Sequence, residues 1–300
     1  MWLGSFNPAV RWNKVTIVGV GLLGGSLGLA LRQRGLAGCV YGLVRRTASI
    51  DECARLGVVD QASCDPVRAA EGAELVVLCT PLSRMRATLE PMLPALKPGT
   101  VVTDVGSVKV PVVQELEPLV ASAGAHFIGS HPMAGSEKTG PGAARADLFE
   151  RAVCVVTPTP QSASSAVEQV EALWQGLGGR VLRLSAQRHD ELVGRASHLP
   201  HVVAAGLAKY VLSPDAPPEQ ALVCASGFRD VTRIAASSAE IWRDIALANA
   251  VNLAEALTVF IRELEQFRQA LLQGNQAAVE QFFQTARQRR TAWANPAGGG

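Results

Sequence analysis

The sequence lacks an excess of either charge, because 28 lysines and arginines face 26 aspartates and glutamates and leave a net charge of +2 over 300 residues. This balance excludes a protein that binds nucleic acid or a membrane surface through bulk charge. Long apolar runs are also missing: glycine, proline or a charged residue interrupts each within about twenty residues, so we expect no membrane span. The N-terminal stretch MWLGSFNPAVRW carries no basic segment ahead of an apolar core, so we expect no secretory signal.

Cysteines are few, and no two of them share C-x-x-C spacing. In a chain of this length without a signal segment, such cysteines are typical of buried free thiols rather than of disulfides or metal ligands. We therefore expect the protein to reside in the cytoplasm. The six cysteines are Cys39, Cys53, Cys64, Cys79, Cys154 and Cys224.

Short apolar runs alternate with helical patterns in the first half of the chain. The runs are rich in β-branched residues and do not alternate with polar ones, which is typical of parallel strands covered on both faces. Helical spacing separates them, most clearly at Leu22–Gly35 and Ala166–Leu177. This repetition predicts an α/β fold with a doubly wound parallel (Rossmann) sheet. The expected strands are Lys14–Val20, Cys39–Val44, Glu74–Pro81, Thr100–Ser107, Ala152–Pro158 and Arg180–Ser185.

The second half reads as helical throughout. A long helix is expected to begin at the N-cap Ser185, and Pro200 should kink it by removing the hydrogen bond to Ala196. Further helices are expected at Trp242–Leu272 and Asn275–Arg290. We therefore predict a dinucleotide-binding domain over 1–184, a helical domain over 185–292, and a disordered tail over 293–300.

A glycine motif directly follows the first expected strand and opens the first expected helix. Gly19 permits a tight turn, Gly21 allows close approach of a pyrophosphate, and Gly24 allows the helix to pack closely on the strand. The intervening Leu22 and Leu23 lie in the first helical turn, whose N–H groups and positive dipole end favour phosphates. The motif in this context predicts dinucleotide binding.

The end of the second expected strand bears on the choice of cofactor. An enzyme that uses NAD usually places an acidic residue there to bind the ribose 2′-hydroxyl. This chain has Arg45, Arg46 and Thr47 instead, and guanidinium groups suit a 2′-phosphate by charge and geometry. We therefore expect NADP, with NAD still possible; the alternative is that both arginines are ordinary solvated charges.

Two other expected strand ends should line the ligand crevice. Thr80 and Pro81 end one of them and are expected to form the wall beside the cofactor. Ser107 ends the other. It either hydrogen-bonds a bound ligand or caps the helix that follows.

His131 lies between the apolar segment HFIG and a turn rich in glycine and proline. A neutral imidazole at the crevice could accept a proton near pH 7. A purely structural histidine remains the alternative.

Two histidines and an arginine are candidates in the helical half. His198 and His201 are three residues apart and share a helix face, but no third ligand is evident, so we expect no metal. Arg233 could bind a substrate carboxylate, or instead pair internally with Asp230 or Asp244.

The order and spacing of five segments resemble those of prephenate/arogenate dehydrogenases, from about Val15 to about Phe283. The segments HPMAGSE and GFRDVTRIA are more specific than the glycine motif. The five segments are GVGLLGGSLGLAL, DVGSVK, GSHPMAGSEKTG, ASHLPHVVAAGLA and SGFRDVTRIAASSAEIWRDI.

The resemblance implies oxidation and decarboxylation of prephenate or arogenate in tyrosine biosynthesis. It implies that His131 takes the proton of the ring 4-hydroxyl, that Ser107 holds the same hydroxyl, and that Arg233 grips a substrate carboxylate. We expect His131 and Arg233 to face one cavity beside the nicotinamide. Which of the two substrates is used is not evident from the sequence.

The resemblance also implies roles for further residues and for the helical domain. His198, His201 and Trp242 should line the substrate pocket, and Ser136 and Glu137 should gate it. The helical domain should form a homodimer.

Two alternatives stay open beside this resemblance. One is an NADP-dependent dehydrogenase of the β-hydroxyacid type, which would use a lysine on the long helix; this chain offers only Lys209 near the helix end. The other is a protein that binds NADP without catalysis.

Overall fold

The computed structural model describes residues 11–294, which form two compact units, 11–250 and 251–294. The predicted boundary near Ser185 falls inside the first unit. Residues 1–10, over which we expect no secretory signal, and 295–300 of the expected tail lie outside the described residues.

The first unit is built on one eight-stranded sheet with the order β3-β2-β1-β4-β5-β6-β7-β8. The strands from β3 to β6 are all parallel, as predicted, with the strand order of a dinucleotide-binding sheet. β7 runs antiparallel to β6, and β8 is parallel to β7, so the sheet is not parallel throughout. The strands are β1 (Trp12–Val18), β2 (Ala37–Leu43), β3 (Gln61–Ser63), β4 (Leu75–Leu78), β5 (Val101–Asp104), β6 (His126–Pro132), β7 (Val153–Thr157) and β8 (Arg180–Arg183).

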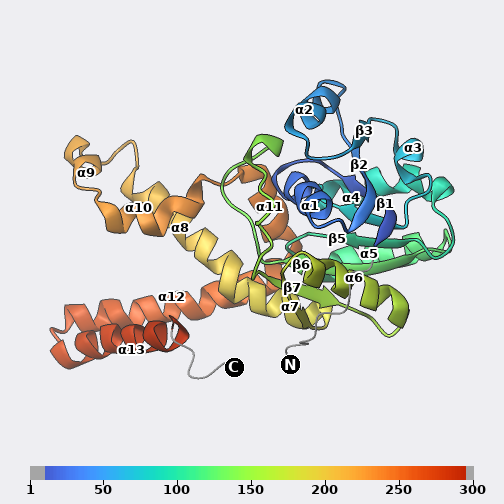
Figure 1. Ribbon diagram of the computed structural model, residues 1–300. Coiled ribbons are helices and arrows are strands. Elements are labelled where there is room, and N and C mark those ends of the chain that lie inside the picture. Colours follow the sequence, from blue (N-terminus) through green and yellow to red (C-terminus); the bar gives the residue numbers. More distant parts are fainter. Residues whose placement is uncertain (1–10, 295–300) are drawn as a thin grey trace. The chain divides into compact units, whose positions relative to one another are not determined.

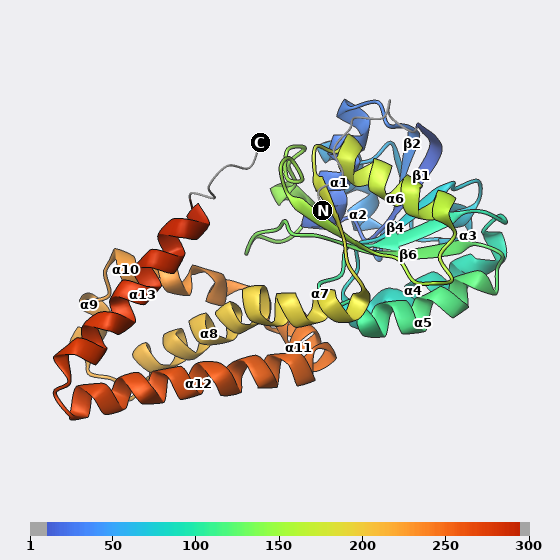
Figure 2. The same ribbon diagram turned by 90° about the horizontal axis from the view of Figure 1, so that it is seen from below.

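Helices cover both faces of this sheet. Figure 2 shows α1 and α6 on one side and α4 and α5 on the other. The helices of this region are α1 (Leu22–Gln33), α2 (Ala48–Leu56), α3 (Pro66–Ala70), α4 (Met85–Leu89), α5 (Val110–Ala121) and α6 (Ser164–Gly176), with 3-10 turns at Leu82–Arg84, Glu90–Ala95 and Pro141–Ala143.

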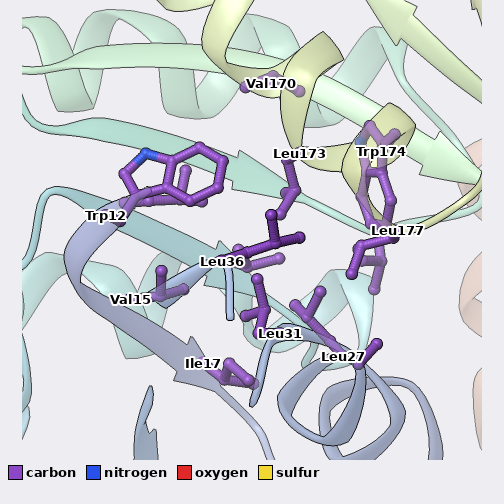
Figure 3. Close-up of a cluster of buried hydrophobic side chains, with 14 of the residues drawn as sticks. Trp12, Val15, Ile17, Leu27, Leu31, Leu36, Val170, Leu173, Trp174 and Leu177 are labelled. Atoms are coloured by element: carbon purple, nitrogen blue, oxygen red, sulfur yellow. The ribbon is translucent and has the colours of Figure 1, made fainter. Parts of the chain in front are cut away.

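Each face of the sheet has its own hydrophobic core. On one face Ile17 of β1, Leu31 of α1 and Trp174 of α6 are all buried in a single cluster (Figure 3). On the other face Leu89 of α4 and Leu116 of α5 pack with strand residues in a second cluster. Burial on both faces explains the unbroken apolar runs of the strands.

The chain after β8 is helical, as predicted. Ser185 caps α7 (Ala186–Val193) by accepting a hydrogen bond from the Arg188 backbone N–H. A π-helical turn (Gly194–His198) joins it to α8 (Leu199–Val211), so the disturbance predicted at Pro200 takes the form of a widened turn just before it. Then follow α9 (Pro218–Leu222), α10 (Ser226–Thr232), a 3-10 turn (Arg233–Ala236) and α11 (Ala239–Ala248), shown in Figure 1.

The prediction of one helix over Trp242–Leu272 is wrong. α11 ends before Asn249, and α12 (Ala250–Leu272) begins after it. Asn249 has a non-helical backbone conformation (φ −115°, ψ 30°), and its buried side chain is engaged elsewhere. The second unit consists of α12 and α13 (Gln276–Ala294), so 293 and 294 are helical and not part of a disordered tail.

The two helices of the second unit pack through aromatic rings. The Phe267 ring of α12 lies 4.5 Å from the Phe282 ring and 5.6 Å from the Phe283 ring of α13, between centroids. No single helix within 11–294 has the length and apolar character needed to cross a bilayer; α11 and α12 meet that criterion only when taken together across their break.

Candidate active site

The glycine loop lies between the end of β1 and the start of α1, at the point where the strand order reverses. Gly19 has φ +94° and donates its N–H to the Leu43 carbonyl of β2 at 2.9 Å. A Cβ on Gly24 would lie 2.1 Å from the Gly19 carbonyl oxygen, whereas a Cβ on Gly21 would meet nothing within 4 Å. Gly24 is therefore required by packing, and the space beside Gly21 is open.

The surroundings of this loop fit a dinucleotide. Gly21 is the N-cap of α1 and provides no side-chain cap, so the first N–H groups of the helix, at Leu22 and Leu23, are left for an anion. The Thr80 hydroxyl, just after β4, is buried without a hydrogen-bond partner in the described part of the chain. Pro81 beside it is exposed. The unpaired Thr80 hydroxyl suits a bound polar ligand.

One residue, Val44, separates β2 from Arg45, Arg46 and Thr47, which are all exposed. Within 11–294 neither arginine forms an ion pair, and the first acidic residue after them is Asp51 in α2. The cation-rich, acid-free character predicted for this strand end is therefore present.

His131 lies on β6, one residue before the strand ends, and is 7% exposed. Its neighbour Ser130 is held by Asp104 of β5, whose Oδ1 accepts the Ser130 N–H at 3.1 Å and whose carbonyl accepts the Ser130 hydroxyl at 2.7 Å. The buried Lys109 ammonium pairs with the Asp104 carboxylate and donates to the Ser130 carbonyl at 2.8 Å. These bonds fix the strand position from which the imidazole projects.

A chain of hydrogen bonds runs from His131 into the first helix of the helical region. His131 Nδ1 lies 2.9 Å from His189 Nε2, and His189 Nδ1 lies 2.7 Å from Asp190 Oδ1. The same Asp190 carboxylate accepts the backbone N–H groups of Lys109 at 2.7 Å and Val110 at 2.8 Å. The side chains of His131, His189 and Asp190 are all buried.

Burial keeps these imidazoles neutral. It lowers the pKa of His131 well below 6.5, and the nearby His189, Lys109 and His198 lower it further. Burial also lowers the pKa of His189, partly offset by its hydrogen bond to Asp190. A neutral imidazole keeps one nitrogen lone pair, so His131 can accept a proton at neutral pH.

Ser107 is half-buried in the loop between β5 and α5. It is not the cap of α5: the helix begins at Val110, and Asp190 takes the N–H groups at its start. The Ser107 hydroxyl makes no hydrogen bond inside the described ranges. Of the two alternatives for this residue, the structure rules out the helix cap and leaves the hydroxyl available to a ligand.

His198 and His201 both contact Trp242 of α11. The His201 ring stacks on the indole with centroids 3.6 Å apart, and the His198 ring meets it edge-on at 6.0 Å. The Asn249 side-chain amide donates to the Asp190 carbonyl at 2.8 Å and lies 3.1 Å from His198 Nδ1. Burial lowers the pKa of His198 to about 4.

Arg233 pairs with Glu137 at 2.8 Å, not with Asp230 or Asp244. The guanidinium is largely exposed. Burial lowers the pKa of His201, and the charge of Arg233 lowers it further. Ser136, beside Glu137, is exposed and accepts the Lys138 N–H at 3.2 Å. Arg233 thus lies close enough to His201 to affect its pKa, as His198 does for His131.

Three residues of the site were missed from the sequence: His189, Asp190 and Asn249. The adjacent His189 and Asp190 were the available signal. A helix that packs on a sheet seldom buries a histidine and an aspartate unless each side chain has a hydrogen-bond partner. Over residues 11–294 no group of three or more histidine, cysteine or acidic side chains is arranged to hold a metal ion.

All six cysteines are free, as predicted. Cys53 and Cys154 are buried, but Cys64 is exposed, so the expectation that all would be buried is wrong.

Comparison with known families gives two adjoining matches. The model described as prephenate dehydrogenase, nucleotide-binding domain, matches residues 27–183. The model described as prephenate dehydrogenase, dimerization domain, matches residues 185–288.

Comparison with individual proteins gives matches over almost the whole chain. The prephenate dehydrogenase of Bacillus subtilis is 33% identical over 92% of this chain and 75% of its own length. The cyclohexadienyl dehydrogenase of Zymomonas mobilis is 33% identical over 93% of this chain and 95% of its own. The crystal structure of prephenate dehydrogenase from A. aeolicus, in complex with hydroxyphenyl propionate and NAD+, is 30% identical, covers 94% of this chain and 98% of that one, and superposes with a TM-score of 0.88.

Proposed function

The chain belongs to the prephenate dehydrogenase family, and we propose that it oxidises and decarboxylates prephenate or arogenate in tyrosine biosynthesis. The observation that carries the proposal is the placement of His131. It is a buried, neutral imidazole on β6, held through His189 by Asp190, and β6 belongs to the same sheet as the glycine loop.

The proposed reaction needs little covalent chemistry from the protein. Loss of hydride from C4 of the substrate ring and loss of the ring carboxylate as CO2 make the ring aromatic, which drives the reaction. The nicotinamide supplies the hydride acceptor when bound. His131 takes the proton of the 4-hydroxyl, and Ser107 hydrogen-bonds the same hydroxyl so that C4 is held in place.

We propose that Arg233 binds a substrate carboxylate through charge-assisted hydrogen bonds. His198, His201 and Trp242 then form the wall of the same pocket, and Glu137, with Ser136 beside it, controls access because it pairs with the guanidinium. His131 and Arg233 face this one cavity. Support comes from proximity: His198 helps to lower the pKa of His131, His201 that of His198, and Arg233 that of His201.

We propose NADP as the preferred cofactor. The support is the exposed pair Arg45 and Arg46 just after β2, where the sequence before Asp51 contains no acidic residue for a ribose 2′-hydroxyl. Thr47 adds a hydroxyl at the start of α2. The A. aeolicus relative was crystallised with NAD+, so the preference proposed here is a property of this chain's own strand end.

We further propose that residues 1–184 bind the dinucleotide and that residues 185–292 form a homodimer. The matched family models meet at this boundary, and the second is described as a dimerization domain. Large apolar side chains such as Tyr210, Leu222 and Val223 are more than three-quarters exposed in this region, as expected of a surface that a second copy covers. The free cysteines support a reducing compartment such as the cytoplasm.

One assay tests the proposal. The purified protein is given prephenate or arogenate, each with NAD or NADP, and the absorbance of the reduced nicotinamide is followed. We expect turnover with at least one substrate and a higher kcat/KM with NADP. Cofactor binding without turnover of either substrate would instead support a protein that binds NADP without catalysis.

A further inference from the structure

The backbone at the start of α5 determines the direction of every hydrogen bond in the chain that ends at His131. The N–H groups of Lys109 and Val110 can only donate, and they donate to the two oxygens of Asp190. Asp190 Oδ1 therefore acts as an acceptor, and His189 Nδ1, 2.7 Å away, must carry a hydrogen and donate it.

The remaining nitrogens follow from this first step. His189 is buried, and burial lowers its pKa, so its ring is neutral at pH 7 and Nε2 carries a lone pair. His131 Nδ1, 2.9 Å from that lone pair, must then be the donor. A neutral imidazole has one N–H hydrogen, so His131 Nε2 is the bare nitrogen. Within the described residues it has no hydrogen-bond partner.

We infer that His189 and Asp190 are positioning residues that fix the tautomer of His131, so that its bare nitrogen is Nε2, the nitrogen that takes the substrate proton. The inference rests on the proposed function for the role of that proton. When His131 is protonated at Nε2, its Nδ1–H still donates to the His189 lone pair, so the imidazolium formed keeps its partner.

The same carboxylate also holds the loop of Ser107. Asp190 accepts the N–H groups of Lys109 and Val110, which follow Ser107 by two and three residues. One residue of α7 thus orients the proton acceptor on β6 and anchors the loop that carries the second group proposed to bind the 4-hydroxyl. Neither His189 nor Asp190 needs to touch the substrate for this.

The first test reads the tautomer directly in the unaltered protein. With ¹⁵N-labelled histidine, the chemical shift separates a protonated ring nitrogen from a bare one, and the signals absent from His131→Asn identify His131. We expect a protonated Nδ1 and a bare Nε2 at pH 7.5. A protonated Nε2 with a bare Nδ1 would overturn the inference, and this readout does not depend on which substrate the protein uses.

The second test compares two substitutions of His189. His189→Gln places a carbonyl where it can accept from His131 Nδ1, whereas His189→Leu removes the acceptor. We expect His189→Leu to lower kcat about 100-fold or more and to lose the fixed His131 tautomer, and His189→Gln to stay within about tenfold of the parent. Equal losses in the two variants, or His189→Leu within twofold of the parent, would overturn the inference.

The two tests separate this inference from the proposed function. If the parent protein turns over neither prephenate nor arogenate, the proposed function fails and the nitrogen shifts alone decide the tautomer. If turnover is present and the shifts show a bare Nδ1, the inference fails and the proposed function stands.

Discussion

Arg233 donates to the Glu137 carboxylate at 2.8 Å across 96 residues of sequence, so the guanidinium proposed to bind substrate already has an anionic partner. The pair is partly solvated, with Arg233 61% and Glu137 30% exposed at their side chains. Solvent screens such a pair, and an entering carboxylate can replace Glu137.

We predict from this relationship that Arg233→Ala raises KM for the substrate about ten- to 100-fold, because a charge-assisted hydrogen bond contributes about 1.5–3 kcal/mol. KM for the cofactor should be unchanged. Steady-state kinetics with each component varied in turn measures both. Arg188→Ala, which removes another exposed arginine paired with a glutamate, is the matched control, and an equal effect there would contradict the prediction.

Replacement of His131 should affect chemistry and not cofactor binding. We expect His131→Asn to lower kcat about 10²–10⁴-fold, which is the usual contribution of a general base. The dissociation constant of the cofactor, from nicotinamide fluorescence, should stay within twofold of the parent. Full turnover by this variant would show that another group takes the proton.

Two glycines of the same loop should respond differently to alanine. A Cβ on Gly24 would lie 2.1 Å from the Gly19 carbonyl oxygen, so Gly24→Ala should lower the thermal unfolding midpoint by several degrees. At Gly21 a Cβ meets nothing within 4 Å, so Gly21→Ala should fold normally and bind the dinucleotide more weakly. Calorimetry and cofactor titration distinguish the two; similar melting points in both variants would refute the packing argument.

Arg45 and Arg46, after β2, should determine the preference for NADP over NAD. We expect Arg45→Ala combined with Arg46→Ala to lower kcat/KM for NADP about ten- to 100-fold, while kcat/KM for NAD changes less than threefold. Arg55→Ala removes an exposed arginine from the last turn of α2 and serves as the control. Parallel losses with NAD and NADP would mean that these arginines do not contact the 2′-phosphate.

The buried histidines make stability depend on pH. Burial lowers the pKa of His198 from 6.5 to about 4, so the unfolded chain binds the proton more readily than the folded one. The stabilisation is complete above pH 6.5 and is lost as the pH falls toward 4, by about 2 kcal/mol at pH 5 from this group alone. Urea unfolding from pH 8 to 5 measures it.

The same titration on His198→Gln provides the comparison. His131, His189 and His201 also have lowered pKa values, so they add losses in the same direction. The variant should therefore show a shallower dependence rather than none. A flat free energy of unfolding in the parent protein between pH 8 and 5 would contradict the assignment of these rings as neutral.

The dinucleotide half was largely predictable because its signals are local. Apolar runs, glycine spacing and the cap at Ser185 each depend on a few adjacent residues, and the structure confirms the strands and the cap they indicated. The antiparallel direction of β7 could not be predicted from its own sequence, because an apolar run has the same pattern in a parallel and an antiparallel strand. The glycine-rich stretch 133–152 was the hint, because a parallel crossover usually needs a full helix between its strands.

The site in the helical region was less predictable because helix periodicity fails there. On a regular helix Asp190 and His198 would lie about 80° apart around the axis. The π-helical turn between them accommodates about one extra residue, which reduces the angle between Asp190 and His198 around the helix axis to about 20°. Asn249 then bridges both, and its side-chain bonds accompany the break between α11 and α12. Neither the π-helical turn nor the break between α11 and α12 leaves a pattern in the local sequence.

The antiparallel pairing of β7 with β6 has a consequence for how precisely the imidazole is held. β5 accompanies β6 only as far as Ile128, but β7 pairs with it from Gly129 to Pro132. His131 therefore belongs to a paired strand and not to a loop, although catalytic residues are often found on loops. Folding of the chain fixes the position of the imidazole, so the side chain needs little reorganisation when the substrate binds.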